Sequence, residues 1–400
     1  MKPHAVIVGA GPVGVVAALL LARNDVEVTL LERNDELVTT SHAATFHPST
    51  LDLLQTMDID LAAVPGAITV ASLQWRDNRA DILAELDYRL LSELTKHPFR
   101  IHLDQQALLD RAADLIAGNP AIELRCGAAV VDLDPELPSV TVLATDSRRH
   151  TTTADVVIGC DGSHSLTRRR AGIALAVRSY PTAALRAYAR ADLAALLPAS
   201  AAQPLSGLCY FRGDGDGLST LRMAADTRVI VRSIGDRPDA VRVAQAIADA
   251  TPWAADDLAI DRIESYQLGR GVVDSYLSSL GPVLVIGDAA HVTSTAGGLN
   301  MNSGLHDAFA LMPALADWLH RRVDKSVVAD IAETRRQYLL DHVIPRTERR
   351  VRGLQDNDSV SLTTHLDDIA SLAGDRDKAR RFLIEASLLD TPLPLQAGLR

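Results

Sequence analysis

Near the N-terminus, two short apolar runs flank a glycine-rich segment and a longer apolar segment. His4–Val8 and Val26–Leu31 are short apolar runs of the length expected for buried strands. Between them, Gly9–Gly14 has the composition of a tight turn and Val15–Arg23 that of a buried helix. A strand, a helix and a second strand in this order predict a βαβ unit with a parallel sheet.

Patterns typical of helices and of strands recur further along the chain. Helices are predicted at Leu51–Met57, Gln105–Ala117, Asn302–Arg321 and, as a charged amphipathic helix, Ala329–Gly353. Strands are predicted at Ile122–Arg125, Ala129–Leu133, Val140–Ala144, Asp155–Gly159 and Val283–Ile286. From about Tyr180 to Tyr276, apolar and polar residues alternate within short segments, at Leu208–Phe211, Ser219–Met223 and Arg228–Ser233. This stretch indicates a β-rich domain inserted into the first.

Composition narrows the class of protein. The chain has 400 residues, 47% hydrophobic and 23% charged, which is typical of a globular protein with two or three packed units. A net charge of −11 argues against nucleic-acid binding by charge, and no apolar run is long enough to span a membrane. Cys126, Cys160 and Cys209 show no metal-ligand spacing, so we expect reduced core thiols, no metal and a cytoplasmic protein.

The first turn carries the glycine run Gly9-Ala10-Gly11-Pro12-Val13-Gly14. Gly9 permits the tight turn, Gly11 lets the backbone approach a pyrophosphate, and Gly14 lets helix and strand pack closely. The N-terminus of the helix offers unpaired N–H groups and partial positive charge to an anion. Glu32 closes the second strand, where a carboxylate accepts hydrogen bonds from a ribose. The alternative is a glycine turn that binds nothing.

Two more motifs follow predicted buried strands. Asp161-Gly162-Ser163-His164-Ser165 comes directly after one strand, and Gly287-Asp288-Ala289-Ala290-His291 after another. The loop Gly297-Gly298-Leu299-Asn300-Met301-Asn302-Ser303-Gly304 then opens a helix. Since α/β sheets bind ligands at the carboxyl ends of their strands, we expect these loops and the first glycine turn to meet around one ligand.

The three motifs, in this order and at this spacing, resemble the class A flavoprotein monooxygenases, the para-hydroxybenzoate hydroxylase-like family, over roughly residues 4–345. The resemblance implies an α/β fold: a Rossmann-type FAD-binding domain, an inserted mixed β-sheet substrate domain and a helical C-terminal tail. The boundaries would be 1–178 with 277–345, then 179–276, then 346–400. The thioredoxin-like domain that many relatives carry is expected to be absent.

The resemblance also implies roles for individual residues. The expected FAD-binding residues are Gly9, Gly11, Pro12, Val13, Gly14, Glu32, Arg33, His42, Gln105, Asp161, Gly162, Asp288, Gly298, Leu299, Asn300, Met301 and Asn302. Within this set, Asp288 would bind the ribityl chain, Asp161 and Gly162 would serve FAD and the nicotinamide donor, and Gln105 rather than Gln106 would contact the sugar-phosphate chain. The expected substrate contacts are Tyr210, Arg222 and Thr295, with Tyr266 and Arg270 in the same sheet domain as the first two. For the four residues of that domain, packing or an ion pair is the alternative.

Four positions depart from the family pattern. His42 and His164 stand where arginines are usual, and neutral imidazole is a poor substitute for a guanidinium fork. Thr295 replaces a proline and Asn300 a glycine in the loop beside the flavin. Asparagine tolerates positive φ better than most residues, so we expect the loop to keep its shape.

The resemblance implies hydroxylation of a phenolic or polycyclic aromatic. NADH or NADPH would reduce FAD, and reduced FAD with O₂ would form a C4a-hydroperoxide that delivers oxygen to the ring. His47 is a candidate catalytic base, against the reading of a structural histidine in a loop. The alternatives are a flavin epoxidase, a Baeyer–Villiger-like oxygenase, a dehydrogenase and a non-catalytic FAD-binding protein. The oligomeric state stays open.

Overall fold

The computed structural model describes residues 2–38, 43–145, 147–199, 203–213, 217–234, 239–294, 297–355 and 359–393. One part of the molecule is built on a five-stranded sheet in the order β18-β12-β1-β2-β8, in which all neighbouring strands run parallel. The strands are β1 (His4–Val8), β2 (Glu27–Leu31), β8 (Ile122–Arg125), β12 (Val156–Gly159) and β18 (Val283–Val285). Their apolar side chains are almost wholly buried, as expected for a covered parallel sheet.

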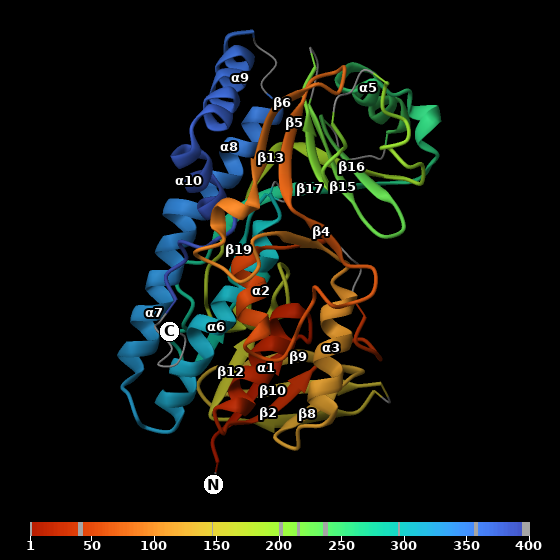
Figure 1. The fold of residues 1–400 in the computed structure, drawn as a ribbon. Helices are drawn as coiled ribbons and strands as arrows, with labels where there is room; N and C mark the ends of the chain where they lie inside the picture. The colour runs from red at the N-terminus through yellow and green to blue at the C-terminus, as the bar shows by residue number, and fades with distance from the viewer. Residues whose placement is uncertain are drawn as a thin grey trace.

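Helices cover this sheet. Helix α1 (Pro12–Arg23) begins with proline at its first position, where the missing N–H leaves no hydrogen bond unmade. It packs against α3 (Gln106–Ala117) and the long α6 (Leu299–Leu319), as Figure 1 shows. Two shorter helices are α2 (Pro48–Gln55) and α4 (Leu166–Arg170), and a small antiparallel sheet contains β9 (Ala128–Asp134), β10 (Ser139–Ala144) and β11 (Arg149–Thr153). The predicted α/β fold with a dinucleotide-type parallel sheet is confirmed.

A second sheet of eight strands lies above the first in Figure 1, in the order β19-β17-β13-β16-β15-β14-β5-β6. It is mixed, because β14 and β5 pair in parallel and the other neighbours are antiparallel. The strands are β5 (Ser72–Arg76), β6 (Ile82–Asp87), β13 (Arg178–Ala189), β14 (Leu208–Phe211), β15 (Leu218–Arg222), β16 (Thr227–Ile234), β17 (Ile260–Val272) and β19 (His291–Val292). Helix α5 (Ala240–Ala250) and the turn η2 (Ala255–Leu258) complete this part.

Three strands of the large sheet come from outside the stretch Tyr180–Tyr276 in which the sequence indicated a β-rich domain: β5 and β6 before it, and β19 after it. Strands β5 and β6 precede that stretch by about a hundred residues and add an edge beside β14. A small sheet of β3 (Thr45–Phe46), β7 (Arg100–His102) and β4 (Ile68–Val70), with the turn η1 (Tyr88–Leu91), connects the two halves. The division at residues 179 and 276 stays a prediction, and the inserted strands share their sheet with this earlier segment.

The C-terminal helices run along one side of the molecule from the lower sheet to the upper one (Figure 1). They are α7 (Lys325–Tyr338), the π-helical turn η4 (Leu339–Val343), α8 (Ile344–Gln355), α9 (Ser359–Gly374) and α10 (Arg376–Ala386). The chain is helical across the predicted helix Ala329–Gly353, but the π turn separates α7 from α8. Helix α9 contacts β6 and α10 contacts η1, so the predicted tail packs against the large sheet.

Candidate cofactor and substrate site

One cavity of about 330 Å³ collects all three motifs. The first motif contributes Gly11, Pro12 and Val13, and the second contributes Gly162. The third motif and its following loop contribute Asp288, Gly297, Gly298, Asn300 and Met301. Segments that lie up to 290 positions apart in the sequence therefore meet, as expected, at the carboxyl ends of β1, β12 and β18.

The three glycines of the first turn have different surroundings. A side chain at Gly14 would place its Cβ 1.9 Å from the Gly9 carbonyl oxygen, and one at Gly9 would lie 2.5 Å from the Cys160 carbonyl oxygen. Both positions therefore require glycine for packing alone, and Gly9 also has φ +97°. At Gly11, by contrast, a Cβ would meet no atom within 4 Å. Space is thus open above Gly11, on the cavity side of the N-terminus of α1.

Glu32 is fixed at the end of β2. Its carboxylate accepts hydrogen bonds from the backbone N–H of Ala10 at 3.0 Å and of Asn34 at 3.0 Å. It therefore lies beside the glycine turn, while Arg33 is exposed. Neither residue lines the cavity itself.

The loop after β12 is folded around Asp161. The Asp161 carboxylate accepts hydrogen bonds from the hydroxyl of Ser165 and from the N–H and hydroxyl of Thr167, the latter two at 3.0 Å. It points into its own loop, whereas Gly162, with φ +80° and no atom within 4 Å of a Cβ, faces the cavity. His164 is exposed. Buried Arg168 instead ties this loop to the third motif, donating to the Ala289 carbonyl at 2.9 Å.

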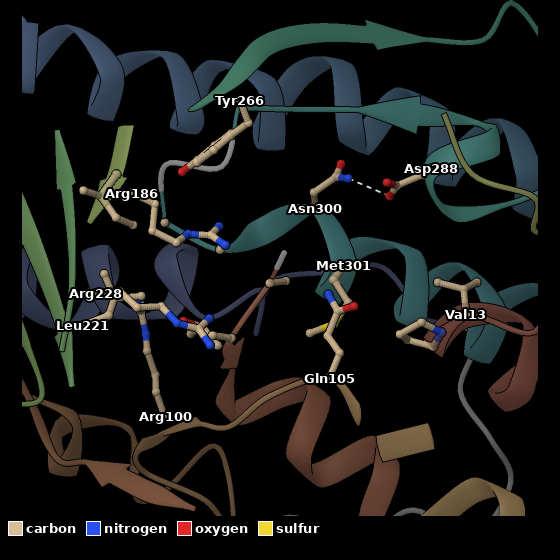
Figure 2. A pocket seen from close by; sticks show the side chains of 18 of the residues that line it. Val13, Arg100, Gln105, Arg186, Leu221, Arg228, Tyr266, Asp288, Asn300 and Met301 are labelled. Atoms are coloured by element: carbon tan, nitrogen blue, oxygen red, sulfur yellow. Dashed lines mark hydrogen bonds between the residues drawn. The ribbon is translucent and has the colours of Figure 1, made fainter. Parts of the chain in front are cut away.

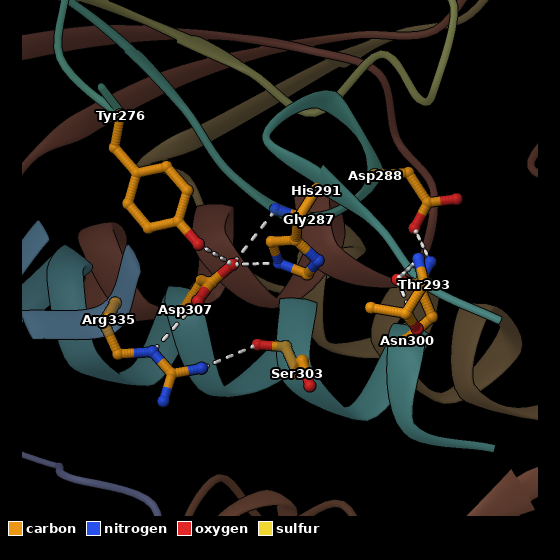
Figure 3. Close-up of polar contacts among 9 residues, drawn as sticks. All are labelled: Tyr276, Gly287, Asp288, His291, Thr293, Asn300, Ser303, Asp307 and Arg335. Carbon is orange, nitrogen blue, oxygen red and sulfur yellow. Dashed lines mark hydrogen bonds and ion pairs between the residues drawn. The ribbon is translucent and has the colours of Figure 1, made fainter. Parts of the chain in front are cut away.

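Asn300 bridges two parts of the third motif. Its side-chain amide donates to the Asp288 carboxylate at 2.7 Å, and its oxygen accepts from the Thr293 N–H at 3.1 Å (Figures 2 and 3). Asn300 lies in the first turn of α6, and Gly298, which caps that helix, has φ +67°. The left-handed conformation expected in this loop thus falls on glycine rather than on Asn300.

The turn that carries Asp288 is anchored from below by a buried carboxylate, as Figure 3 shows. Asp307 has no exposed surface and accepts hydrogen bonds from the Gly287 N–H at 3.3 Å, from His291 Nε2 at 2.7 Å and from Arg335 Nε at 3.0 Å. Burial would raise the pKa of Asp307, but His291 and Arg335 reverse that effect and hold it below its usual value. Asp307 therefore stays ionised and fixes the turn.

His47 holds the glycine loop before α6 and does not line the cavity. It is fully buried, and its Nε2 donates to the carbonyls of Gly297 at 3.0 Å and Gly298 at 3.1 Å. Its backbone N–H donates to the side chain of Asn302 at 3.1 Å, and the Asn302 amide donates to Thr45 O and Gly298 O. This geometry favours the structural reading of His47 over the catalytic one. Asn302 and Leu299, both expected to bind FAD, are likewise fully buried and do not line the cavity.

The structure distinguishes two neighbouring glutamines. Gln105 is 8% exposed and lines the cavity at the start of α3, whereas Gln106 donates to the carbonyl of Leu37 and to Asp110. Of the other expected residues, His42 and Thr295 lie outside the described residues.

One face of the large sheet forms the opposite wall. Strands β14, β15, β16, β13 and β17 contribute, in that order, Leu208 and Tyr210, Ser219 and Leu221, Arg228 and Ile230, Arg186, and Tyr266. Arg222, expected here, is instead exposed at the end of β15 and outside the cavity lining. The reason is strand alternation, which turns Leu221 inward and Arg222 away. Arg270 pairs with Glu348 and does not line the cavity.

The sequence analysis did not identify three arginines that line the cavity: Arg186 and Arg228 on the large sheet, and Arg100 on β7 of the small sheet. A signal was present for Arg186, which interrupts the apolar strand Ala183–Ala189, because a charged residue inside such a run seldom occurs without a partner. Helix α10 also reaches this wall. Its Phe382 packs edge-on against Trp75, which stacks on Tyr210 with ring centroids 5.6 Å apart.

The described residues contain neither a metal-binding cluster nor a membrane-spanning helix. No cluster of three or more His, Cys, Asp or Glu side chains among them is arranged to hold a metal ion. Within the same ranges, no helix has the length and apolar character needed to cross a membrane.

Residues 2–343 match the family described as "FAD binding domain". Two similar proteins are 6-hydroxy-3-succinoylpyridine 3-monooxygenase of Pseudomonas putida, 27% identical over 88% of this chain and 89% of its own, and para-nitrophenol 4-monooxygenase of a Pseudomonas species, 22% identical over 96% and 95%. The crystal structure of p-nitrophenol 4-monooxygenase from Pseudomonas putida superposes with a TM-score of 0.86 at 20% identity, covering 98% of each chain.

Proposed function

The chain belongs to the FAD-binding-domain family of flavoprotein aromatic hydroxylases, and we propose that it uses FAD, NADPH or NADH, and O₂ to hydroxylate an aromatic small molecule. The observation that carries the proposal is the meeting of three distant motifs around one cavity. Its two ends differ in chemistry: glycine turns and a helix N-terminus at one, and a wall of apolar, aromatic and arginine side chains at the other. A dinucleotide and an aromatic substrate require these two environments side by side.

The residues present fit FAD. The open space above Gly11 and the N-terminus of α1 would receive the pyrophosphate, with Glu32 beside it for the adenosine ribose. Gln105, Gly162 and Asp288 line the cavity between that turn and the sheet, where the ribityl chain would lie. The N-terminal turn of α6, at Gly298 to Met301, would face the ring system with backbone N–H groups.

When bound, FAD supplies the redox chemistry: it accepts a hydride from the nicotinamide donor and activates O₂ for transfer of one oxygen atom to the ring. The protein contributes exclusion of water and orientation. Leu208, Leu221, Ile230 and Met301 give the cavity an apolar lining that keeps the substrate ring against the cofactor position. Relatives named for a hydroxylated pyridine and for a nitrophenol support a hydroxyl-bearing six-membered aromatic ring as the substrate core.

Isotope labelling tests the reaction. The purified protein should contain one FAD per chain and should oxidise NAD(P)H faster when an aromatic substrate is added. Under ¹⁸O₂, the product should carry one labelled oxygen atom. Label that arrives only from water would exclude the oxygenase reaction, and the absence of any reduction by NAD(P)H would favour a non-catalytic FAD protein.

A pair of glycine variants tests where the dinucleotide binds. Gly11→Ala adds a methyl group to open space, so the apo-protein should unfold at the same denaturant concentration as the parent while FAD affinity falls at least tenfold. Gly14→Ala places the same group 1.9 Å from the Gly9 carbonyl oxygen and should destabilise the fold itself. Unchanged FAD affinity in folded Gly11→Ala would contradict the assignment.

A further inference from the structure

Three aromatic side chains from distant parts of the chain form a row between the cavity and helix α10. Tyr210 on β14 lines the cavity, and Trp75 on β5 stacks on it, with ring centroids 5.6 Å apart and ring planes 26° apart. Phe382 of α10 meets the Trp75 ring edge-on, at a centroid distance of 5.8 Å, and does not line the cavity itself. The row therefore connects a cavity-lining ring with a helix near the C-terminus.

The register of the large sheet places the first two rings together. Strands β14 and β5 run parallel, and Tyr210 lies directly opposite Trp75. Paired residues on neighbouring strands project from the same face of a sheet, so both rings pack there. The alternate residues of β14, Cys209 and Phe211, belong instead to the apolar cluster that α5 covers on the opposite face. A shift of Trp75 therefore acts directly on Tyr210 and on the cavity face of the sheet.

The aromatic row belongs to one apolar cluster that extends from the cavity to the C-terminal helices. Its members include Leu208 and Leu221, which line the cavity, and Ile369 and Leu383, which are buried on α9 and α10. Helix α9 packs against β6 at this edge of the large sheet, and α10 packs against α9 (Figure 1). Protein interiors are close-packed and transmit a change in side-chain volume to their neighbours. A change of volume on α10 therefore reaches the cavity wall.

Helix α10 is held in place at its C-terminal end. Arg100, which lines the cavity and is 1% exposed, donates to the carbonyl of Ala386, the last residue of α10, at 3.1 Å. A cation at this position is favoured by the partial negative charge of the helix C-terminus. Ser49 of α2 donates to the carbonyl of the next residue, Ser387. These hydrogen bonds fix the position of α10 along the sheet, and with it that of Phe382, which lies one helical turn before Ala386.

We propose that Phe382 is a positioning residue that sets the size of the aromatic substrate, because it holds Trp75 and, through Trp75, the Tyr210 ring at the cavity wall. This inference rests on the proposed function and adds a determinant of specificity to it. A substrate ring would lie against Tyr210, one side of which Trp75 already covers. Removal of the Phe382 ring gives Trp75 room to move toward α10, and Tyr210 follows. The substrate end of the cavity then widens.

Calorimetric titration of the FAD-loaded protein with two neutral phenols tests the proposal without requiring turnover. The probes are 4-cyanophenol, which has one ring, and 6-cyano-2-naphthol, which has two. In Phe382→Ala, the Kd of 4-cyanophenol should rise about 3- to 10-fold, as expected for the loss of an aromatic contact. The Kd of 6-cyano-2-naphthol should stay the same or fall, so the preference for two rings over one should rise at least about threefold. FAD affinity should stay at the parent value.

Three further variants separate this role from a general loss of packing. Phe382→Leu keeps most of the side-chain volume, so its ring preference should lie between those of the parent and Phe382→Ala, and it carries the test if Phe382→Ala does not fold. Ile247→Ala removes a fully buried side chain from α5 on the opposite face of the same sheet, so it should lower stability and leave the ring preference unchanged. In a Trp75→Leu background, Phe382→Ala should no longer change the preference, because the link to Tyr210 is already lost.

Four results would overturn the proposal. They are an unchanged ring preference in Phe382→Ala, the same change of preference in Ile247→Ala, a full effect of Phe382→Ala in the Trp75→Leu background, and no binding of either phenol to the parent up to about 10 mM. Incorporation of ¹⁸O from ¹⁸O₂ by a protein whose ring preference does not respond to Phe382→Ala would refute this inference and leave the proposed function standing. A protein that binds no FAD would refute the proposed function itself.

Discussion

Replacing Asp307 with asparagine should destabilise the protein and loosen the turn that carries Asp288. Asp307 is fully buried and receives hydrogen bonds from the Gly287 backbone, His291 and Arg335. The asparagine is nearly the same size, so no cavity forms. What changes is the charge, because Arg335, 1% exposed, would then be a buried cation whose ion pair has been removed.

The expected magnitude follows from this uncompensated charge. Breaking a buried ion pair by removing one partner typically lowers the free energy of unfolding by about 3–5 kcal/mol. For a chain of 400 residues that unfolds as a unit, the unfolding entropy is roughly 0.8 kcal/mol per kelvin. The melting temperature should therefore fall by roughly 4–6 °C. FAD retention should fall as well, since the side-chain amide of the introduced asparagine cannot hold the Gly287 N–H and His291 as the carboxylate does.

Differential scanning calorimetry and the FAD content after gel filtration measure the two effects. Asp317→Asn is the matched control: it removes a carboxylate from the same helix, but one that is 44% exposed and pairs with Arg322 at the surface. That variant should change stability by less than about 0.5 kcal/mol. A double variant, Asp307→Asn with Arg335→Met, should recover part of the loss because it also removes the orphaned cation. If Asp307→Asn has the same melting temperature as Asp317→Asn, the hydrogen bonds of Asp307 do not fix the turn and the reasoning fails.

Three further outcomes are expected. Asn300→Asp places a second carboxylate 2.7 Å from that of Asp288, so FAD affinity should fall at least tenfold. Asn300→Gln should reduce FAD affinity less. Equal FAD affinities of the two variants in fluorescence titration would contradict this. Burial lowers the pKa of His102 to about 4 and of His306 to about 3, so only the unfolded chain gains these protons as the pH falls from about 6.5. Stability should then drop by about 1.4 kcal/mol per pH unit for each histidine, and His306→Asn should flatten the urea midpoints between pH 6.5 and 5. His47→Gln should weaken FAD binding without moving the pH profile of kcat; a displaced profile would restore His47 as the catalytic base.

The dinucleotide half of the site was predictable because its signals are local. In the glycine turn, Gly9 and Gly14 are required by contacts with their own strand, helix and neighbouring loop, and these requirements recur in any sequence that folds this way. The strands before each motif are short apolar runs whose carboxyl ends must meet in a parallel sheet. A few residues therefore specify both the local shape and its place in the fold.

The substrate wall was not predictable to the same degree, since the facing of a side chain depends on register between distant strands. Moving one residue along β15 exchanges Leu221, inside the cavity, for Arg222, outside it. Strand β5 joins this sheet through parallel pairing with β14, a contact between residues more than a hundred positions apart that no local pattern encodes. That Arg228 lines the cavity likewise follows only from the structure.

His164 and Asn300 depart from the family pattern, and other contacts in the same loops compensate for these departures. Arg168, four residues after His164, links the second motif to the third through the Ala289 carbonyl. Asn300 holds the Asp288 carboxylate from the cavity side, while Asp307 holds the Gly287 backbone from the core side. Asp288 is thus restrained at its own side chain and through the main chain of the preceding residue, Gly287. A group held in this way loses little conformational freedom when a ligand binds, so the asparagine that breaks the family pattern adds to the preorganisation of the site.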